Sequence, residues 1–229
     1  MKLLAPYGYN RPNGSYGFLN TVANPFWRFI AARKLTFRNS SYLRVTGYLE
    51  SYKRGYPCDA EGNAVPWMNY SVIQFLRERL SSNLSVFEFG SGFSTLFYAE
   101  RVVSVQSVED NPKWFEVIAK QLPENASVTL QPADEDGKYC RTIKQFDRKF
   151  QLVIIDGRDR VNCFKQSLSC LTDDGVILLD DSAREKYMES IDIGKAAGFR
   201  VLHFEGMKPT ATGLHRTSLF YRSENCLNL

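Results

Sequence analysis

A short apolar segment followed at once by two closely spaced glycines constrains the fold of this chain more than any other feature. Residues 85–95 read SVFEFGSGFST. The first half is β-branched and aromatic apart from one carboxylate, Glu88, as is typical of a buried strand. Gly90 and Gly92 permit dihedrals and close backbone approach that a side chain prevents, and the serine and threonine beyond them can cap a helix. The stretch therefore predicts a strand, a tight turn and the start of a helix.

A strand, a glycine turn and a helix in this order can present a nucleotide-like ligand at the carboxyl end of a parallel strand. A G-x-G motif alone is just as typical of an ordinary turn, so the context decides. The next strand-like segment, residues 101–110, ends in acids, and Glu109 lies 17 residues beyond Gly92. An acid at this place in a strand–helix–strand unit accepts hydrogen bonds from ribose hydroxyls. The two motifs together predict a nucleoside site.

Length and composition limit the class of protein. A chain of 229 residues can form one α/β domain with a full core and some chain left over. A hydrophobic fraction of 44% excludes a disordered chain, no apolar run is long enough to cross a bilayer, and Pro6 interrupts the start too soon for a signal peptide. Five cysteines without C-x-x-C spacing predict reduced thiols in a cytoplasmic protein.

The basic residues are concentrated near the start of the chain. Residues 1–56 contain nine Lys and Arg and one acid, Glu50, so this segment carries +8 and the remainder −4. A basic arm indicates an acidic partner such as a membrane surface, a phosphate-bearing substrate or nucleic acid, and the alternative is a solvated surface that balances an acidic domain. Residues 26–35 predict a short helix, either interfacial on anionic lipid or, as we favour, packed on the domain or a partner subunit.

The rest of the chain alternates between strand and helix patterns. Strands are expected at residues 86–89, 101–110, 127–131, 150–157, 175–182, 199–204 and 217–221. Helices are expected at residues 41–53, 72–80, 112–121, 138–146, 161–171 and 184–197.

The connection between the last two strands is too short for a crossover helix, so these strands should be antiparallel neighbours. The pattern predicts an α/β fold with a Rossmann-like, doubly wound sheet of seven strands, mostly parallel with a terminal antiparallel pair. This domain is expected over residues 66–229, after a basic, aromatic-rich extension of helices and loops over residues 1–65.

These features resemble the class I S-adenosylmethionine-dependent methyltransferases. The resemblance rests on the glycine motif, on Glu109, on the terminal strand pair and on two strand ends, Ile155-Asp156-Gly157 and Leu179-Asp180-Asp181-Ser182. The terminal pair separates this fold from an ordinary NAD-binding Rossmann domain. More narrowly, residues 66–70, 87–95 and 155–160 are similar to stand-alone methyltransferases associated with surface polysaccharide or glycan synthesis.

The resemblance implies S-adenosylmethionine as the cofactor, with Glu88 at its amino group, Glu109 at its ribose and Asp134 at its adenine. The implied cofactor-binding residues are Glu88, Gly90, Ser91, Gly92, Ser94, Thr95, Glu109, Asp134 and Asp156. For Asp134, a loop carboxylate in water is the alternative. The residues predicted to bind substrate, from their own chemistry and position, are Trp67, Tyr70, Arg158 and Arg160.

For all four of these residues, another role is equally open. Trp67 and Tyr70 stand just ahead of the ligand site and can close over substrate, or they can form a hydrophobic staple for the following helix. The arginines can clamp an anionic acceptor group, or they can form surface ion pairs.

Methyl transfer to an alcohol needs positioning and removal of the hydroxyl proton. The candidates for this base are Asp156 and Asp181, at adjacent strand ends, and His215, because an imidazole can exchange a proton near neutral pH. His203 lies inside a strand and is interpreted as structural. Related metal-dependent enzymes carry acids at comparable strand ends, so Asp156 and Asp181 are the candidate metal ligands. Ser182 would be a poor further ligand for Mg²⁺, and a metal is therefore not favoured.

The sequence thus predicts an enzyme, an S-adenosylmethionine-dependent O-methyltransferase that acts on a hydroxyl of a small polar or glycan acceptor. Peripheral membrane contact through the basic arm and an oligomeric state are left open, and nucleic acid is not favoured because no N-P-P-Y-type motif is present. One alternative is an NAD-type nucleotide-binding protein, although Thr95 stands at the third glycine position of G-x-G-x-x-G. Another is a non-catalytic partner protein that keeps the fold.

Overall fold

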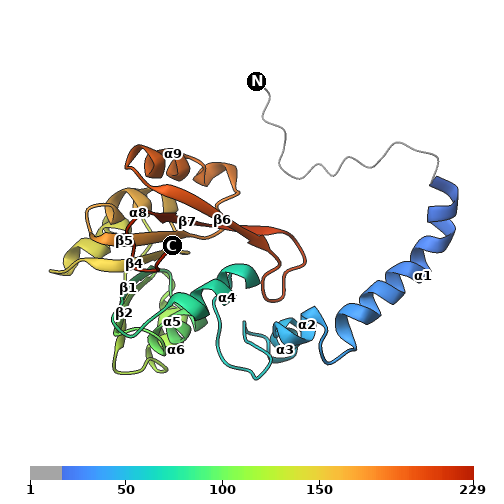
Figure 1. Ribbon diagram of the computed structural model, residues 1–229. Coiled ribbons are helices and arrows are strands. Elements are labelled where there is room, and N and C mark those ends of the chain that lie inside the picture. The colour runs from blue at the N-terminus through green and yellow to red at the C-terminus, as the bar shows by residue number, and fades with distance from the viewer. Residues whose placement is uncertain (1–16) are drawn as a thin grey trace.

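The computed structural model describes residues 17–229, with side chains from residue 26 onward. Its centre is a sheet in the order β3-β2-β1-β4-β5-β7-β6 (Figure 1). Neighbours among β1 to β5 pair in parallel, and β7 is antiparallel to both β5 and β6. The predicted fold is confirmed, including the terminal antiparallel pair. The strands are β1 Ser85–Phe89, β2 Ser104–Glu109, β3 Ala126–Leu130, β4 Phe150–Ile155, β5 Leu171–Leu179, β6 Arg200–Gly206 and β7 His215–Tyr221.

The helices precede and connect these strands. They are α1 Gly17–Thr36, α2 Tyr42–Val45, α3 Tyr48–Arg54, α4 Tyr70–Arg79, α5 Phe93–Ala99, α6 Pro112–Ala119, α7 Lys138–Arg141, α8 Arg160–Ser167 and α9 Glu189–Ala196, with 3₁₀ turns at Thr142–Gln145 and Glu185–Tyr187. α6 begins as its sequence predicts, because Asn111 caps it and Pro112 occupies its first position.

Several helix boundaries differ from the expectation. The single helix expected over residues 41–53 is two short helices, because Gly47 adopts a φ of 81° and a Cβ there would lie 2.3 Å from the Cys58 carbonyl oxygen. The helices expected over residues 138–146 and 184–197 are likewise each a 3₁₀ turn joined to a short α-helix. The first helix is longer than expected and continues through Pro25.

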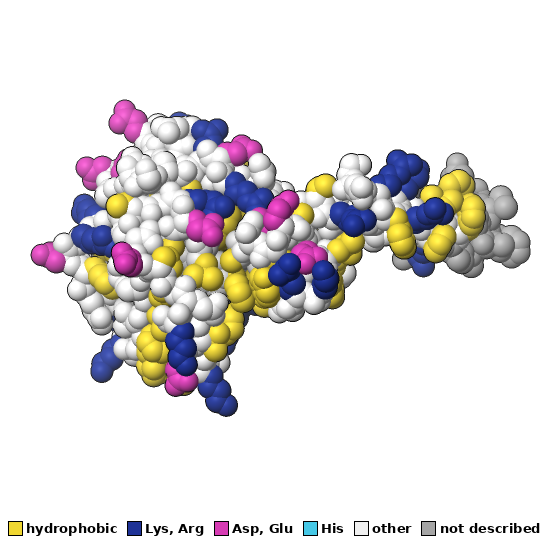
Figure 2. Space-filling view, turned by 90° about the horizontal axis from the view of Figure 1, so that it is seen from below, with side chains coloured by type: hydrophobic (Ala, Val, Ile, Leu, Met, Phe, Trp, Pro, Cys, Tyr) yellow, Lys and Arg dark blue, Asp and Glu magenta, His cyan; other side chains and the backbone are white. Residues whose placement is uncertain are grey.

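α1 projects away from the sheet domain, as Figures 1 and 2 both show. The segment after it is integrated into the domain. Tyr48 is 5% exposed and Val65 fully buried, and both pack in the core beneath the sheet. Packing of the domain therefore begins within the segment that the sequence assigned to the extension.

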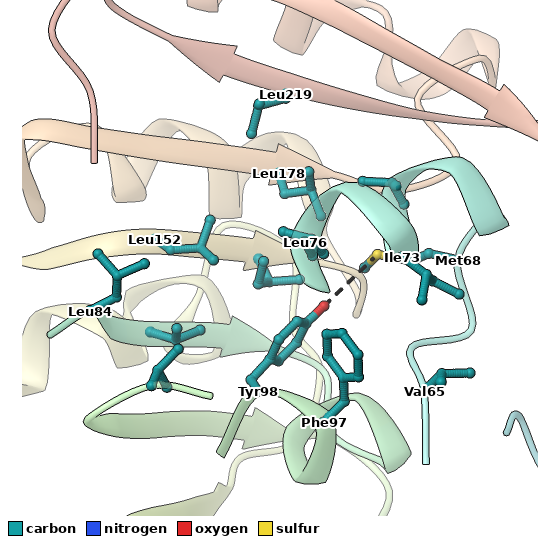
Figure 3. Packing of buried hydrophobic residues seen from close by; sticks show 14 of the residues in the cluster. Val65, Met68, Ile73, Leu76, Leu84, Phe97, Tyr98, Leu152, Leu178 and Leu219 are labelled. Carbon is teal, nitrogen blue, oxygen red and sulfur yellow. Dashed lines mark hydrogen bonds between the residues drawn. The ribbon is translucent and has the colours of Figure 1, made fainter. Parts of the chain in front are cut away.

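Two hydrophobic clusters cover the two faces of the sheet. On one face, residues of α4 and α5 pack against alternate residues of the strands, and Figure 3 shows Leu76 and Phe97 among them. In the same cluster the Tyr98 hydroxyl lies 3.9 Å from the Met68 sulfur. On the other face, aromatic residues such as Phe87 of β1 and Phe164 of α8 pack with the side chains that alternate with the first set. This two-sided burial explains the continuous apolar run of β4.

Candidate functional site

The glycine turn brings the ends of β1 and β4 into contact. Gly90 has a φ of 94°, and a Cβ on it would lie 3.2 Å from the backbone nitrogen and Cα of Gly157. A Cβ on Gly157 would lie 2.8 Å from the Gly90 nitrogen and 2.0 Å from the Tyr139 hydroxyl. Both positions therefore require glycine, the first for its dihedral and both for close approach.

Glu88, next to last in β1, is 1% exposed and accepts hydrogen bonds from three hydroxyls. Ser94 and Thr95 donate to it from the first turn of α5, Thr95 at 2.6 Å. Ser107 donates at 3.0 Å from β2, where it is the register partner of Glu88. Burial raises the pKa of Glu88 to about 7, although the three hydroxyls oppose this shift.

Glu109, the last residue of β2, holds the glycine turn in place. One carboxylate oxygen accepts bonds from the backbone nitrogen and hydroxyl of Ser91, at 3.0 and 2.9 Å. The other accepts from the backbone nitrogens of Asp110 and Asn111. Trp114 of α6 completes the turn by donating from its indole nitrogen to the Ser91 carbonyl at 2.8 Å. The two sequence motifs are thus joined in one structural unit.

A cavity of about 260 Å³ lies over this unit, at the carboxyl ends of β1, β2 and β4. Its size is just below that of typical small-molecule pockets, ~300–1,000 Å³. Its wall consists of Glu88, Gly90, Ser91, Ser94, Glu109, Asp110, Trp114, Asp156, Gly157, Arg158 and Arg160. Six of the predicted cofactor residues are therefore brought together at one cavity.

The other three predicted cofactor residues do not line this cavity. Gly92 and Thr95 form the start of α5, where the Thr95 hydroxyl accepts from the Gly92 nitrogen at 3.0 Å. Asp134 is exposed, and its two carboxylate oxygens accept from the backbone nitrogens of Lys138 and Tyr139. These two backbone bonds lower the pKa of Asp134. The predicted contact of Asp134 with adenine stays a prediction.

Asp156 follows β4 and faces the cavity. Its carboxylate pairs with the Arg160 guanidinium at 2.9 Å. Burial and the neighbouring Asp180 carboxylate raise the pKa of Asp156, while Arg160 opposes the shift. Arg160 also donates to the carbonyls of Asp156, Gly157 and Asp180, at 3.0, 3.0 and 2.6 Å. This arginine, predicted as a substrate clamp, thus joins the ends of β4 and β5.

A second group of charged side chains lies at the ends of β5 and β7. Asp181 is 6% exposed, and one of its oxygens is 3.3 Å from His215 Nδ1 and 3.0 Å from the Lys208 ammonium. Arg184 pairs with its other oxygen. Burial raises the pKa of Asp181, but Lys208 and Arg184 outweigh it, and the net shift is downward. Two of the three predicted catalytic residues, Asp181 and His215, are therefore in contact.

The sequence reasoning missed Lys208, which follows β6. Its ammonium lies 3.3 Å from the fully buried carboxylate of Asp180 as well as close to Asp181. Burial disfavours the charge of Lys208, but these two carboxylates outweigh it and raise its pKa. The signal was present in the sequence: because β6 and β7 are antiparallel, their connection returns to the edge where β5 ends. Ser107 and Trp114 were also missed.

The predicted substrate residues are dispersed. Trp67 is half-exposed, and its indole nitrogen donates to the Pro209 carbonyl at 2.7 Å, next to Lys208. Tyr70 is buried in the core and lines a different cavity of about 340 Å³, and its hydroxyl has no hydrogen-bond partner among the described residues. Arg158 is largely exposed and lies 3.3 Å from Asp110.

A larger polar cavity adjoins the first. Its volume is about 530 Å³, and it shares Gly157, Arg158 and Arg160 with the smaller cavity. Further cationic side chains in its wall come from α8 and from the segment after β5, namely Lys165, Arg184 and Lys186. Within residues 26–229, no three or more His, Cys, Asp or Glu side chains are placed to hold a metal ion together. His203 contacts the Ser218 hydroxyl at 2.7 Å within the β6–β7 pair.

Solved structures with this fold include several methyltransferases. A precorrin-6y C5,15-methyltransferase from Geobacter metallireducens aligns with a TM-score of 0.55 and 13% identity over 67% of this chain and 88% of that chain. An rRNA methylase from Streptococcus thermophilus aligns with a TM-score of 0.52 and 14% identity, over 67% of this chain and 96% of that chain. For a methyltransferase from Pyrococcus furiosus, the TM-score is 0.50 and the identity 16%, over 87% of this chain and 98% of that chain. No protein-family model and no curated protein matches the sequence.

At these identities the similarity establishes the fold. The chain has the α/β, Rossmann-like methyltransferase fold, with a mostly parallel sheet, a terminal antiparallel pair and N-terminal helices. The similar proteins are named for different acceptors, a precorrin and an rRNA. The fold by itself therefore does not identify an acceptor.

Proposed function

We propose that this protein is an S-adenosylmethionine-dependent methyltransferase that methylates a hydroxyl group of a small polar or glycan acceptor. The observation that carries the proposal is the convergence of Glu88, Glu109 and the glycine turn on one cavity at the carboxyl ends of parallel strands. This is the place where open α/β sheets bind nucleotide-like ligands.

The residues around the cavity fit the chemistry of this cofactor. Glu88 offers a carboxylate for an ammonium group, and Glu109, at the tip of β2, can accept from a ribose hydroxyl that replaces the Ser91 hydroxyl. Gly90 has no Cβ, so its backbone can lie close to Gly157 in the cavity wall. When bound, S-adenosylmethionine would supply an electrophilic methyl group on a sulfonium. Trp114 at the rim adds an aromatic surface next to the turn.

We assign the removal of the acceptor proton to His215. If its Nδ1 donates to Asp181, Nε2 remains available as a base, and the carboxylate orients the ring. Asp181 itself is a weak base, because Lys208 and Arg184 lower its pKa. Asp156, with a raised pKa, is the second candidate base. Lys208 and Arg184 together already supply two positive charges to the Asp180–Asp181 pair, so this arrangement does not call for a divalent cation there.

We place the acceptor beside the cofactor cavity, with its reacting hydroxyl toward His215, beside the end of β5. The rest of the acceptor would extend into the larger cavity, which shares Gly157 and Arg158 with the cofactor cavity and whose wall includes Arg184, the partner of Asp181. Its polar wall suits an acceptor rich in hydroxyls, and Arg158 is exposed enough to contact an anionic substituent. Trp67, Tyr70 and Arg160 as substrate residues, a glycan as the acceptor and a cytoplasmic location stay predictions.

Calorimetry of the full chain with S-adenosylmethionine and with NAD tests the cofactor. We expect S-adenosylmethionine to bind and NAD not to bind. Glu109→Gln should weaken binding by about 10- to 100-fold, because a hydrogen bond to a charged group contributes about 1.5–3 kcal/mol. Glu116→Gln, an exposed carboxylate on α6, is the matched control and should bind like the wild type.

Tight NAD binding, or identical affinities for the two variants, would contradict the proposal. A methyl-release screen over sugar acceptors then separates an enzyme from a non-catalytic protein that keeps the fold.

A further inference from the structure

α1 exposes large apolar side chains that nothing in the described structure covers. Phe26, Trp27 and Phe29 are each 63% exposed, and Phe37, which continues the last turn, is 72% exposed. Isolated exposed apolar residues are ordinary, but several aromatic side chains gathered on one projecting helix indicate a binding surface.

These aromatic side chains are interspersed with cations. Arg28, Arg33, Lys34 and Arg38 lie on or just after the same helix, and the first acidic residue of the whole chain is Glu50. Figure 2 shows yellow and dark-blue side chains side by side along the projecting segment. The surface is therefore apolar and uniformly cationic, which fits a partner that is both apolar and anionic.

The spacing of four of the apolar residues places them along one side of the helix, with Trp27 at the margin of this side and Leu35 on the opposite side. Phe26, Phe29, Ile30 and Phe37 follow each other at intervals of three, one and seven residues, which bring them to the same face at 3.6 residues per turn. Arg33 lies on this stripe near its carboxyl end, and long basic side chains can extend from such a position to lipid headgroups while their stems stay in apolar surroundings.

We propose that α1 is a peripheral membrane-docking helix, which lies in the surface of an anionic bilayer with its aromatic side chains in the headgroup region and its cations on the lipid phosphates. In the described part of the chain, no helix has the length and the apolar character needed to cross a bilayer. The proposal is independent of the proposed catalytic function.

A second copy of the chain fits this surface less well. Pairing two α1 helices would bring the cations of one against those of the other, with no acid on either helix to offset the repulsion. A bilayer with anionic headgroups offers both the apolar layer and the opposite charge.

Vesicle flotation tests the proposal with the full chain. We expect binding to vesicles of phosphatidylcholine with added phosphatidylglycerol, little binding to phosphatidylcholine alone, and release at high salt. Brominated lipids should quench the fluorescence of Trp27, so that Trp27→Phe loses the quenched component while Trp67 and Trp114 keep their signals.

Two double variants separate the apolar and the electrostatic contributions. Arg33→Glu with Lys34→Glu should lower the partition coefficient at least about 25-fold, since each cation near an anionic surface contributes roughly 5-fold. Phe26→Ser with Phe29→Ser should also abolish binding. The matched controls are Lys120→Glu with Lys144→Glu and Val103→Ser with Val117→Ser, exposed positions of the same kinds on the domain.

Three results of the vesicle assay would overturn the proposal: no binding to anionic vesicles, equal binding to neutral vesicles, or equal loss of binding in the control variants. Sedimentation analysis tests the alternative that a second copy of the chain binds this surface. An oligomer that Phe26→Ser with Phe29→Ser converts to a monomer would assign α1 to an interface between copies instead.

Discussion

At the scale of the residue, burial dominates the behaviour of Glu88. Its ordinary pKa is 4.5, and in the folded protein the pKa is about 7 because the charged form is desolvated. Three hydroxyl donors reduce this penalty without removing it. A carboxylate held in this way is ready to ionise when a cationic group arrives, which suits the proposed contact with an ammonium.

The shift of Glu88 predicts a pH-dependent stability. Between about pH 4.5 and 7 the folded protein holds a proton that the unfolded chain has released, so the free energy of unfolding falls as the pH rises through this window. The full loss is about 3 kcal/mol for this shift. Urea unfolding at pH 5 and pH 8 measures the change.

The glutamine in Glu88→Gln cannot ionise. Between pH 5 and pH 8, the free energy of unfolding of this variant should therefore fall by about 3 kcal/mol less than that of the wild type. The comparison between variants removes the contribution of all other titrating groups. The same pH dependence in both proteins would show that the side chain is solvated well enough to ionise freely.

At the scale of the element, the attachment of α4 to the sheet depends on one buried amide. Asn69 caps α4 by accepting from the Val72 nitrogen at 3.1 Å, and it donates to the Phe204 carbonyl and the Thr217 hydroxyl. Thr217 in turn donates to Asp180 at 2.6 Å. The cap therefore also supports the charged group at the end of β5.

Asn69→Ala should lower the free energy of unfolding by about 2–4 kcal/mol, because it removes a cap and leaves the buried Thr217 hydroxyl and the partly buried Phe204 carbonyl without one of their donors. Asn111→Ala is the matched control. Asn111 caps α6 with two backbone bonds but is exposed, so its loss should cost only about 1 kcal/mol. Denaturant unfolding of both variants gives the comparison, and equal losses would mean that the Asn69 bridge to β6 and β7 adds nothing to its cap.

At the scale of the whole molecule, the chain divides after α1. Residues 26–40 are exposed or partly exposed throughout, whereas α3 and the loop after it contribute buried residues to the core. Limited trypsin digestion should therefore cut first at Arg33, Lys34 or Arg38.

The resulting fragment, identified by mass spectrometry, should keep the unfolding midpoint of the intact protein. Protection of these three sites in the absence of lipid, or a fragment without a cooperative transition, would mean that α1 stabilises the domain. Protection on anionic vesicles is expected if α1 docks to them.

The sequence by itself was sufficient to predict the strand pattern, the glycine turn and the positions of Glu88 and Glu109 near the carboxyl ends of their strands. Each of these depends on neighbours along the chain, namely the alternation of side chains in a strand and the dihedrals that only glycine adopts freely. The boundaries of short helices were less predictable, because the break at Gly47 depends on the close approach of Cys58 from outside the helix.

The tertiary structure decided what the polar and charged residues contact. Lys208 meets Asp180 across 28 positions of sequence, and Asn69 meets Thr217 across 148. The contacts of Arg160 also depend on the tertiary structure, since the strand order places its guanidinium between the ends of β4 and β5. Such contacts follow from which strands become neighbours, and a side chain's type and local spacing do not carry that information.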